Sequence, residues 1–248
     1  MIIDAHAHLG LDEAFDEDFT ESELLESQAQ NGIDVTVVQP AVAFGLSTVQ
    51  RYHDAIADLG RRFPGRFYGM ANPCPHLPEE DYRREVRRCV EELGFVGIKL
   101  HPFAHAVNPV GCHGRRVFDV AEELQVPVMV HTGSGLPWSA PALLAPMAEA
   151  HPGVTIILAH AGGMICAGEA GQLAARFSNV YLEPSWTGAF LVRAWSRNLG
   201  ADRIMLGSDH ADNAATELAK FRSAGLTDEE LDLTLGGTAQ AVFKLPRG

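Results

Sequence analysis

Short runs of apolar and β-branched residues recur along the chain at regular intervals. Each run is five to seven residues long and almost continuously apolar, a pattern typical of strands that are buried on both faces of a parallel sheet. Successive runs begin 24 to 33 residues apart, which leaves room for one strand, one helix and their connections. The eight predicted strands begin at Ile2, Val35, Arg66, Phe95, Val126, Val154, Asn179 and Arg203.

The segments between these strands have the spacing and the end signals of helices. From Pro78 to Leu93, apolar residues recur every three or four positions, and Gly94 follows as a helix-ending residue. The arginines of this segment are interleaved with glutamates, which is typical of a solvated helix face. Capping-box sequences predict three further helix starts, at Thr20, Ser47 and Thr227.

Eight strands that alternate with helices over 248 residues predict one α/β domain, residues 1–248, folded as a single (β/α)8 TIM barrel with extra C-terminal helices. A doubly wound sheet that binds a dinucleotide would instead carry GxGxxG after its first strand. This chain reads HAHLGLDE at that turn. The pattern therefore favours the closed barrel.

Composition then narrows the partners. The chain has 19 Lys and Arg against 32 Asp and Glu, and its net charge of −13 repels the phosphates of nucleic acids and anionic lipid surfaces. We therefore expect a small-molecule substrate and neither nucleic acid nor a membrane as partner. The N-terminus lacks the pattern of a secretory signal, so a cytoplasmic protein with four reduced, scattered cysteines is expected.

Polar side chains interrupt the apolar pattern at the carboxyl ends of five predicted strands. In a parallel barrel these ends meet on one face, where such folds place their catalytic groups. Burying several imidazoles and a carboxylate without partners costs about 1–3 kcal/mol per group, so a cation or a reaction must use them. The residues are His6, His8, Lys99, His101, His131, His160 and Asp209.

His6 and His8 indicate a metal site. Because side chains alternate along a strand, both can point into the barrel mouth and hold one ion, with Asp4 beneath them. Imidazole and carboxylate ligands suit zinc, which we expect, and also manganese, iron or nickel. Three histidines on predicted helices or connections are expected at the surface instead, namely His53, His76 and His151.

The motifs DAHAHLG, GIKLHP, VMVHTG, LAHAGG and LGSDH occur in this order and together resemble the amidohydrolase-2 branch of the amidohydrolase superfamily. The C-terminal LGGTAQAVFKL also looks like the closing helix of that branch, where GG is usually followed by Asn-Ala. The resemblance covers essentially the whole chain. It implies one divalent metal on His6, His8, His131 and Asp209, with His160 as the proton carrier and Asp209 as both ligand and general base.

Lys99 raises the question of a second ion, because binuclear members of this superfamily bridge two metals with a carboxylated lysine of strand four. Here the lysine lies two residues deeper than His101, roughly 6.6 Å down the strand. We therefore expect one ion, and a binuclear site with His101 and His160 on the second ion is the alternative. Superfamily relatives often form dimers, so a homodimer is an alternative to a monomer.

The resemblance does not separate hydrolases from the non-oxidative decarboxylases of the same branch. The natural partner of a substrate carboxylate is arginine, and the predicted loops at the mouth contain neither Arg nor Lys. We therefore expect hydrolysis of a small amide, ester or lactone. The alternatives are decarboxylation of a small aromatic or unsaturated acid, and a barrel that binds metal or ligand without catalysis. The predicted substrate contacts are Lys99, His101, Trp138 and Trp186.

Overall fold

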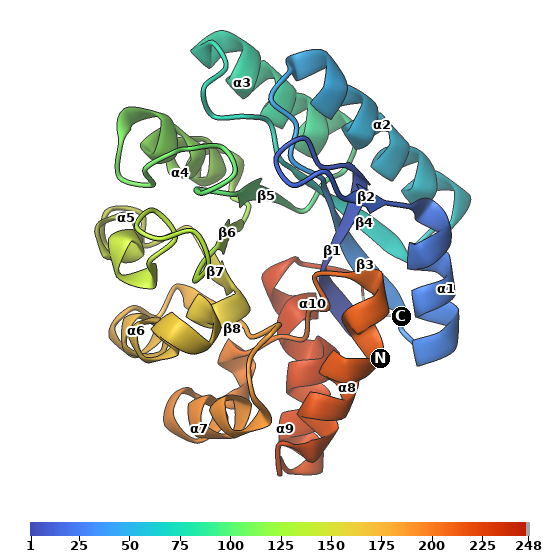
Figure 1. Cartoon of the computed structure of the whole chain (residues 1–248), viewed down its shortest axis with the longest axis vertical. Helices are drawn as coiled ribbons and strands as arrows, with labels where there is room; N and C mark the ends of the chain where they lie inside the picture. The colour runs from blue at the N-terminus through green and yellow to red at the C-terminus, as the bar shows by residue number, and fades with distance from the viewer. Residues whose placement is uncertain (247–248) are drawn as a thin grey trace.

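The structure is a computed structural model that describes residues 1–246, and its centre is a curled sheet ringed by helices (Figure 1). Seven parallel strands follow one another in chain order around the sheet, and the two-residue β2 pairs antiparallel with the end of β1. Seven of the eight predicted strands are therefore present. The strands are β1 (Ile3–Leu11), β2 (Asp18–Phe19), β3 (Val35–Pro40), β4 (Phe67–Ala71), β5 (Gly97–Leu100), β6 (Val128–His131), β7 (Ile156–Ala159) and β8 (Val180–Glu183).

The eighth predicted strand, from Arg203, is not a regular strand, and here the prediction is wrong in detail. The segment 204–209 nevertheless lies between β8 and β1. Met205 N–H donates to the carbonyl of Leu182 (3.0 Å), and the N–H of Ala5 donates to the carbonyl of Leu206 (2.9 Å). The segment departs from extended geometry at Asp209, whose φ of 65° no strand residue adopts.

Helices cover the outside of the sheet. The capping boxes at Thr20 and Thr227 are confirmed, whereas α2 begins at Leu46 after an uncapped Gly45, so the predicted start at Ser47 is wrong. The helices are α1 (Glu21–Asn31), α2 (Leu46–Arg62), α3 (Glu79–Arg87), α4 (Cys112–Leu124), α5 (Ala145–Ala150), α6 (Gly163–Arg176), α7 (Ala189–Leu199), α8 (Ala214–Ser223), α9 (Asp228–Asp232) and α10 (Thr238–Val242). Shorter helical turns span Arg88–Glu92, Pro141–Leu144, His160–Gly162, Ala201–Arg203, Ala211–Asn213 and Leu233–Gly237.

An irregularity in β1 directs its histidines inward. The pairing of β1 with β3 shifts between Asp4 and Ala7, as a β-bulge does. Ile3 belongs to the apolar cluster inside the curled sheet, whereas Ala7 belongs to the cluster between sheet and helices. An uninterrupted strand would place both on one face, because they are an even number of residues apart. The change of face lets His6 point inward above the inner cluster.

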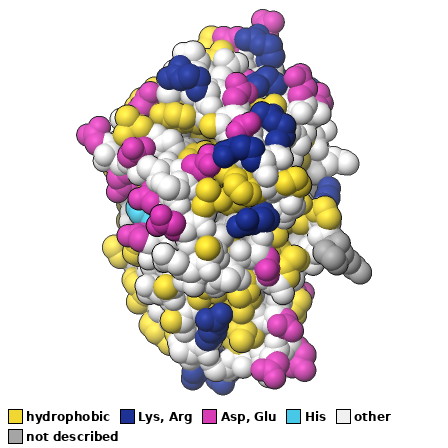
Figure 2. All heavy atoms as spheres, turned by 90° about the vertical axis from the view of Figure 1, so that its right-hand side faces the viewer, with side chains coloured by type: hydrophobic (Ala, Val, Ile, Leu, Met, Phe, Trp, Pro, Cys, Tyr) yellow, Lys and Arg dark blue, Asp and Glu magenta, His cyan; other side chains and the backbone are white. Residues whose placement is uncertain are grey.

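On the side that carries α1 and α2, acidic and basic side chains are interspersed over the upper and central part of the view, and acidic side chains gather at its left edge (Figure 2). The interleaved arginines of α3 pair with carboxylates: Arg83 Nε lies 2.8 Å from Glu79, and Arg87 lies 2.7 Å from Glu123. Within residues 1–246, no helix is long and apolar enough to cross a membrane.

Candidate metal centre and active site

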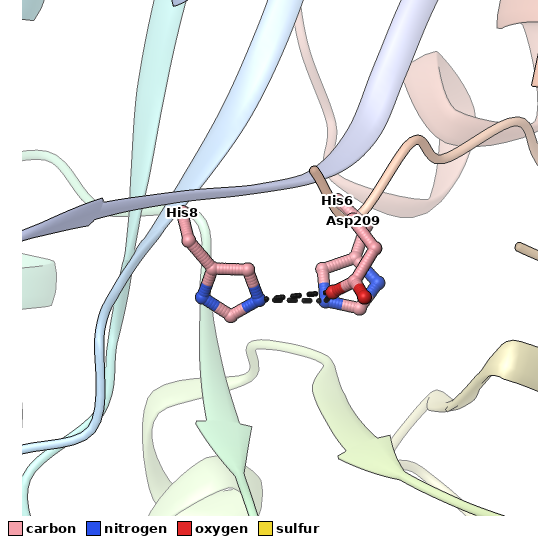
Figure 3. Close-up of side chains that lie close together, drawn as sticks. All are labelled: His6, His8 and Asp209. Atoms are coloured by element: carbon pink, nitrogen blue, oxygen red, sulfur yellow. Dashed lines mark hydrogen bonds and ion pairs between the residues drawn. The ribbon is translucent and has the colours of Figure 1, made fainter. Parts of the chain in front are cut away.

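Three predicted ligands converge at the carboxyl ends of the strands. His6 and His8 project from β1, and Asp209 ends the irregular segment beside it (Figure 3). Asp209 Oδ1 lies 3.1 Å from His6 Nε2 and 3.2 Å from His8 Nε2, and the two ring nitrogens are 3.1 Å apart. One carboxylate and two imidazoles this close together are suited to binding a single cation. The fourth implied ligand, His131, lies outside this tight trio.

The backbone at the site is strained. His160, Trp186 and Asp209 have φ angles of 62°, 61° and 65°, a left-handed conformation that crowds the Cβ of any L-residue. Such conformations cost about 1–3 kcal/mol each and concentrate at functional sites. Three of the eight non-glycine residues with positive φ in the described chain are thus predicted site residues.

The bond between His6 and Glu183 determines which ring nitrogen of His6 has the lone pair that can bind a metal. Glu183, at the end of β8, is fully buried, and its Oε2 lies 2.7 Å from His6 Nδ1. A carboxylate only accepts hydrogen bonds, so Nδ1 carries the proton and Nε2 has a lone pair. That lone pair faces Asp209 and His8, and such a convergence of lone pairs and negative charge fits the divalent cation that the motifs imply.

His160 and His131 face each other in a similar way. His160 Nδ1 lies 2.7 Å from the hydroxyl of Ser185, which donates its own proton to Glu183, so the imidazole is the donor. His131 Nε2 donates to the carbonyl of Ser134 at 3.0 Å. The remaining nitrogens, His160 Nε2 and His131 Nδ1, are 3.1 Å apart and both carry lone pairs. A shared proton or a cation relieves this arrangement.

Lys99 and His101 also reach the site. Lys99 Nζ lies 2.8 Å from His6 Nε2 although the lysine is almost completely buried, and burial lowers its pKa to about 8. The ring of His101 stacks on that of His131, with centroids 4.0 Å apart. Both residues were predicted to contact the substrate, and both lie beside predicted metal ligands. The choice between one and two metal ions stays a prediction.

Burial favours the neutral form of three of the site histidines. Burial and neighbouring positive groups hold the pKa of His6 and of His131 well below the usual value for histidine, and burial lowers the pKa of His160 to about 4. Burial alone would raise the pKa of Asp209, but His160, His6 and His8 outweigh it and hold that pKa well below its ordinary value. Neutral imidazoles and an ionised carboxylate are the forms that bind metals.

A cavity of about 230 Å³ opens onto this cluster. Phe15 and Phe103 contribute aromatic side chains to it, with ring centroids 6.1 Å apart. No arginine lines the cavity in the described part of the chain, and Lys99 is its basic residue. Its remaining lining is His8, Asp12, Glu17, Phe19, His101, His131, Ser134, His160, Asp209 and His210.

The two predicted tryptophans differ in position. Trp186 Nε1 donates to Asp209 Oδ2 at 2.8 Å and lines an adjoining hollow of about 470 Å³ together with Met164 and Ile165. Trp138 lines neither of these two cavities of the described chain. The structure therefore brings Trp186 to the site and leaves Trp138 outside it.

Sequence reasoning missed Glu183 and Ser185. The signal was available, because Glu183 is a lone charged residue at the carboxyl end of an apolar strand, where the other site residues were found. The placement of two histidines at the surface was also wrong. His53 is fully buried and His151 nearly so, whereas His76 is exposed as predicted.

The chain is similar to a known protein family, to a curated protein and to solved structures. A family model described as amidohydrolase matches residues 3–245. The γ-resorcylate decarboxylase of Rhodococcus jostii (strain RHA1) is 25% identical over 258 residues, which cover 82% of this chain and 78% of the relative. A dihydroxybenzoic acid decarboxylase from Polaromonas sp. JS666, solved with manganese and the inhibitor 2-nitroresorcinol, has a TM-score of 0.76 at 20% identity, covering 100% of this chain and 98% of that one. The 5-carboxyvanillate decarboxylase of Sphingomonas paucimobilis has a TM-score of 0.78 at 15% identity, covering 99% of both chains.

These relatives contradict the prediction of a hydrolase, because each of them is a decarboxylase. The prediction rested on the lack of basic residues in the loops. That reasoning undervalued Lys99, which lines the cavity from a strand rather than from a loop. The resemblance drawn from the five motifs is confirmed, since the matched region extends over nearly the whole sequence, and the chain belongs to the amidohydrolase family.

Proposed function

We propose that this protein is a metal-dependent decarboxylase that releases carbon dioxide, without oxidation, from a small hydroxylated aromatic acid. The observation that carries the proposal is the similarity to γ-resorcylate decarboxylase over 82% of the chain. The cavity supports it, since it combines aromatic side chains, a buried lysine and a cluster of metal-binding groups in a volume suited to one small molecule.

We propose that one divalent ion is held by His6, His8, His131 and Asp209. When bound, such an ion supplies a fixed positive charge that orients the anionic substrate and stabilises the charge developing as the carboxyl group leaves. Nitrogen and oxygen ligands suit manganese, which the Polaromonas enzyme contains, as well as zinc.

The residues of the chain supply the rest of the chemistry. Decarboxylation breaks the bond between the ring and the carboxyl carbon, leaves the electron pair on the ring carbon and consumes one proton there. The acidic substrate or water supplies that proton, and His160 accepts it at Nε2, where the neutral imidazole has a lone pair, and passes it to the ring carbon. Lys99 offers a charge-assisted hydrogen bond to a substrate oxygen, and Trp186 orients the Asp209 carboxylate.

We infer further that the described residues act as one domain, and that segment 204–209 serves as the eighth strand of a closed (β/α)8 barrel. Its hydrogen bonds to both β8 and β1 support this reading.

The test is an assay of carbon dioxide release from 2,6-dihydroxybenzoate, 2,4-dihydroxybenzoate and 5-carboxyvanillate, with protein loaded separately with manganese and zinc and its metal content measured. Release from at least one acid, with about one ion per chain, is the expected result. Loaded protein that releases no carbon dioxide from any of the acids would overturn the proposed function, and two ions per chain would overturn the mononuclear site.

A further inference from the structure

One buried carboxylate lies between the metal centre and the proton carrier. Glu183 Oε2 lies 2.7 Å from His6 Nδ1 and 3.0 Å from the Ser185 hydroxyl. Its other oxygen, Oε1, accepts from the backbone N–H of Ser185 at 2.7 Å, and the N–H of His160 approaches Oε2 at 3.3 Å. Glu183 and Ser185 are fully buried, so these bonds determine where the protons lie without competition from bulk water.

The Glu183 carboxylate determines the direction of the hydrogen bonds that connect His6, Ser185 and His160. Because Glu183 can only accept, His6 Nδ1 and the Ser185 hydroxyl must both donate to it. The Ser185 hydroxyl has one proton, which it donates to Glu183. Its oxygen therefore accepts a hydrogen bond from His160 Nδ1–H at 2.7 Å. His6 and His160 are therefore both protonated at Nδ1, and both have a lone pair at Nε2, which in His6 faces the ammonium of Lys99.

The fold reserves space for this carboxylate. A Cβ added at Gly207 would lie 2.7 Å from both Cδ and Oε1 of Glu183, closer than real Cβ contacts allow. Gly207 belongs to the segment that also carries Asp209, so one stretch of chain accommodates the carboxylate and supplies a predicted ligand. A glycine here permits close packing that any larger residue would prevent.

We propose that Glu183 and Ser185 are positioning residues that determine the tautomers of two histidines. They leave Nε2 of His6 unprotonated, so that it binds the metal, and Nε2 of His160 unprotonated, so that it accepts and releases the proton. Metal binding and proton transfer are then coupled through one carboxylate. Only the prediction for turnover rests on the proposed decarboxylation, because the tautomers and the metal affinity are measured without substrate.

The first test is Glu183→Gln. An amide replaces one carboxylate oxygen by an NH2 group. Depending on the orientation of the amide, this group faces either His6 Nδ1–H and the Ser185 hydroxyl or the Ser185 backbone N–H, all of which are donors. We expect metal affinity, measured by titration with zinc, to fall about 10–100-fold. Histidine ¹⁵N NMR of the metal-free variant should show His6 no longer held solely as the Nδ1–H tautomer. A folded variant with wild-type affinity and an unchanged His6 tautomer would overturn the proposal.

The second test separates the two histidines and decides the matter if Glu183→Gln does not fold. Ser185→Ala removes the partner of His160 but leaves the bond between Glu183 and His6. We expect unchanged zinc affinity, loss of the single Nδ1–H tautomer of His160, and a fall in kcat of about 10–100-fold with little change in KM. If His160 stays in the Nδ1–H tautomer, Ser185 does not position it and the proposal fails.

A matched control lies elsewhere in the chain. Glu85 Oε1 lies 2.6 Å from Nδ1 of the buried His53, the same pairing outside the candidate metal centre. Glu85→Gln should leave the tautomers of His6 and His160 and the zinc affinity unchanged. A loss of zinc affinity in Glu85→Gln equal to that in Glu183→Gln would show that a general loss of rigidity explains both, and would overturn the positioning role.

Discussion

Two fully buried histidines of this protein each have a glutamate beside Nδ1 but differ in what lies beside Nε2. His6 Nδ1 lies 2.7 Å from Glu183, and His53 Nδ1 lies 2.6 Å from Glu85. The Nε2 of His53 accepts a hydrogen bond from the backbone N–H of Asn72 at 3.1 Å. The Nε2 of His6 receives no backbone donor and faces other side chains with lone pairs, together with a lysine.

The difference teaches what distinguishes a metal centre from a buried polar network. The ligand atoms of His53, Glu85 and Cys89 also lie within 4.8 Å of one another, so proximity alone would count them as a second site. However, Glu85 already accepts from Arg88 and Gln50, and His53 has no free lone pair. We interpret this network as structural, because its bonds tie α2 to α3 and to the residue that follows β4.

The sharpest way to break this comparison is to remove each imidazole in turn. We expect His6→Ala to lose the bound ion and all measurable decarboxylation, because it removes one of the proposed ligands and leaves Lys99 facing Asp209. His53→Ala, the matched variant, should keep its ion and, where folded, its turnover. Metal analysis of the two purified proteins checks this, and loss of the ion from His53→Ala alone would reverse the assignment.

The comparison extends to the proton carrier. His160→Ala should retain the ion and lower kcat by about 10²–10⁴-fold, the usual contribution of a positioned acid or base. The measurements are metal content and kcat on whichever hydroxylated acid the wild type decarboxylates. Loss of the ion in this variant would instead make His160 a ligand.

The sequence predicts the metal centre around His6 far better than the buried network around His53. His6, His8 and Asp209 could be placed together because the carboxyl ends of parallel strands meet on one face, whatever the details of the helices. His53 was misplaced although its signal was present: it lies four residues after Val49 and three before Ile56, on the buried face of α2.

Other features had no local signal. The left-handed backbone of Asp209 and the irregular course of segment 204–209 depend on contacts with β1 and β8 that no spacing encodes. The chemistry was predicted wrongly for a related reason. Lys99 was predicted as a substrate contact, but the search for a partner of a substrate carboxylate covered the loops alone. It therefore did not count this strand lysine, whose Nζ reaches His6 across the inside of the curled sheet.

If the network of His53 and Glu85 is structural, disrupting it should lower the stability of the protein without affecting catalysis. Glu85→Ala leaves the fully buried His53 without its carboxylate partner, and leaves the partly buried Arg88 with Asp54 alone. We expect the free energy of unfolding to fall by about 3 kcal/mol. Urea unfolding measures this, and metal content and turnover at a temperature where the variant is folded serve as the control. A large loss of metal with little loss of stability would mean that Glu85 belongs to a functional site after all.

The smallest effect that we predict is the response of this network to acid. Burial alone would raise the pKa of Glu85, but hydrogen bonds from His53, Arg88 and Gln50 outweigh it and lower that pKa to about 2, from 4.5 for a free side chain. Because the folded-state pKa is the lower one, the stabilisation is complete above the unfolded-state pKa and is lost as the pH falls from 4.5 towards 2.

Between about pH 7 and pH 3.5 the contribution of Glu85 should shrink by about 1–1.5 kcal/mol. Glu85→Gln cannot titrate at this position, so the stability difference between wild type and variant should narrow by that amount over the same range in urea titrations. His53, whose own pKa burial lowers, faces Glu85 directly, so the difference reports on the pair rather than on one group. A difference that stays constant with pH would mean that the pair is not an ionised carboxylate held by donors, and the contrast with the metal centre would then rest on the Asn72 hydrogen bond alone.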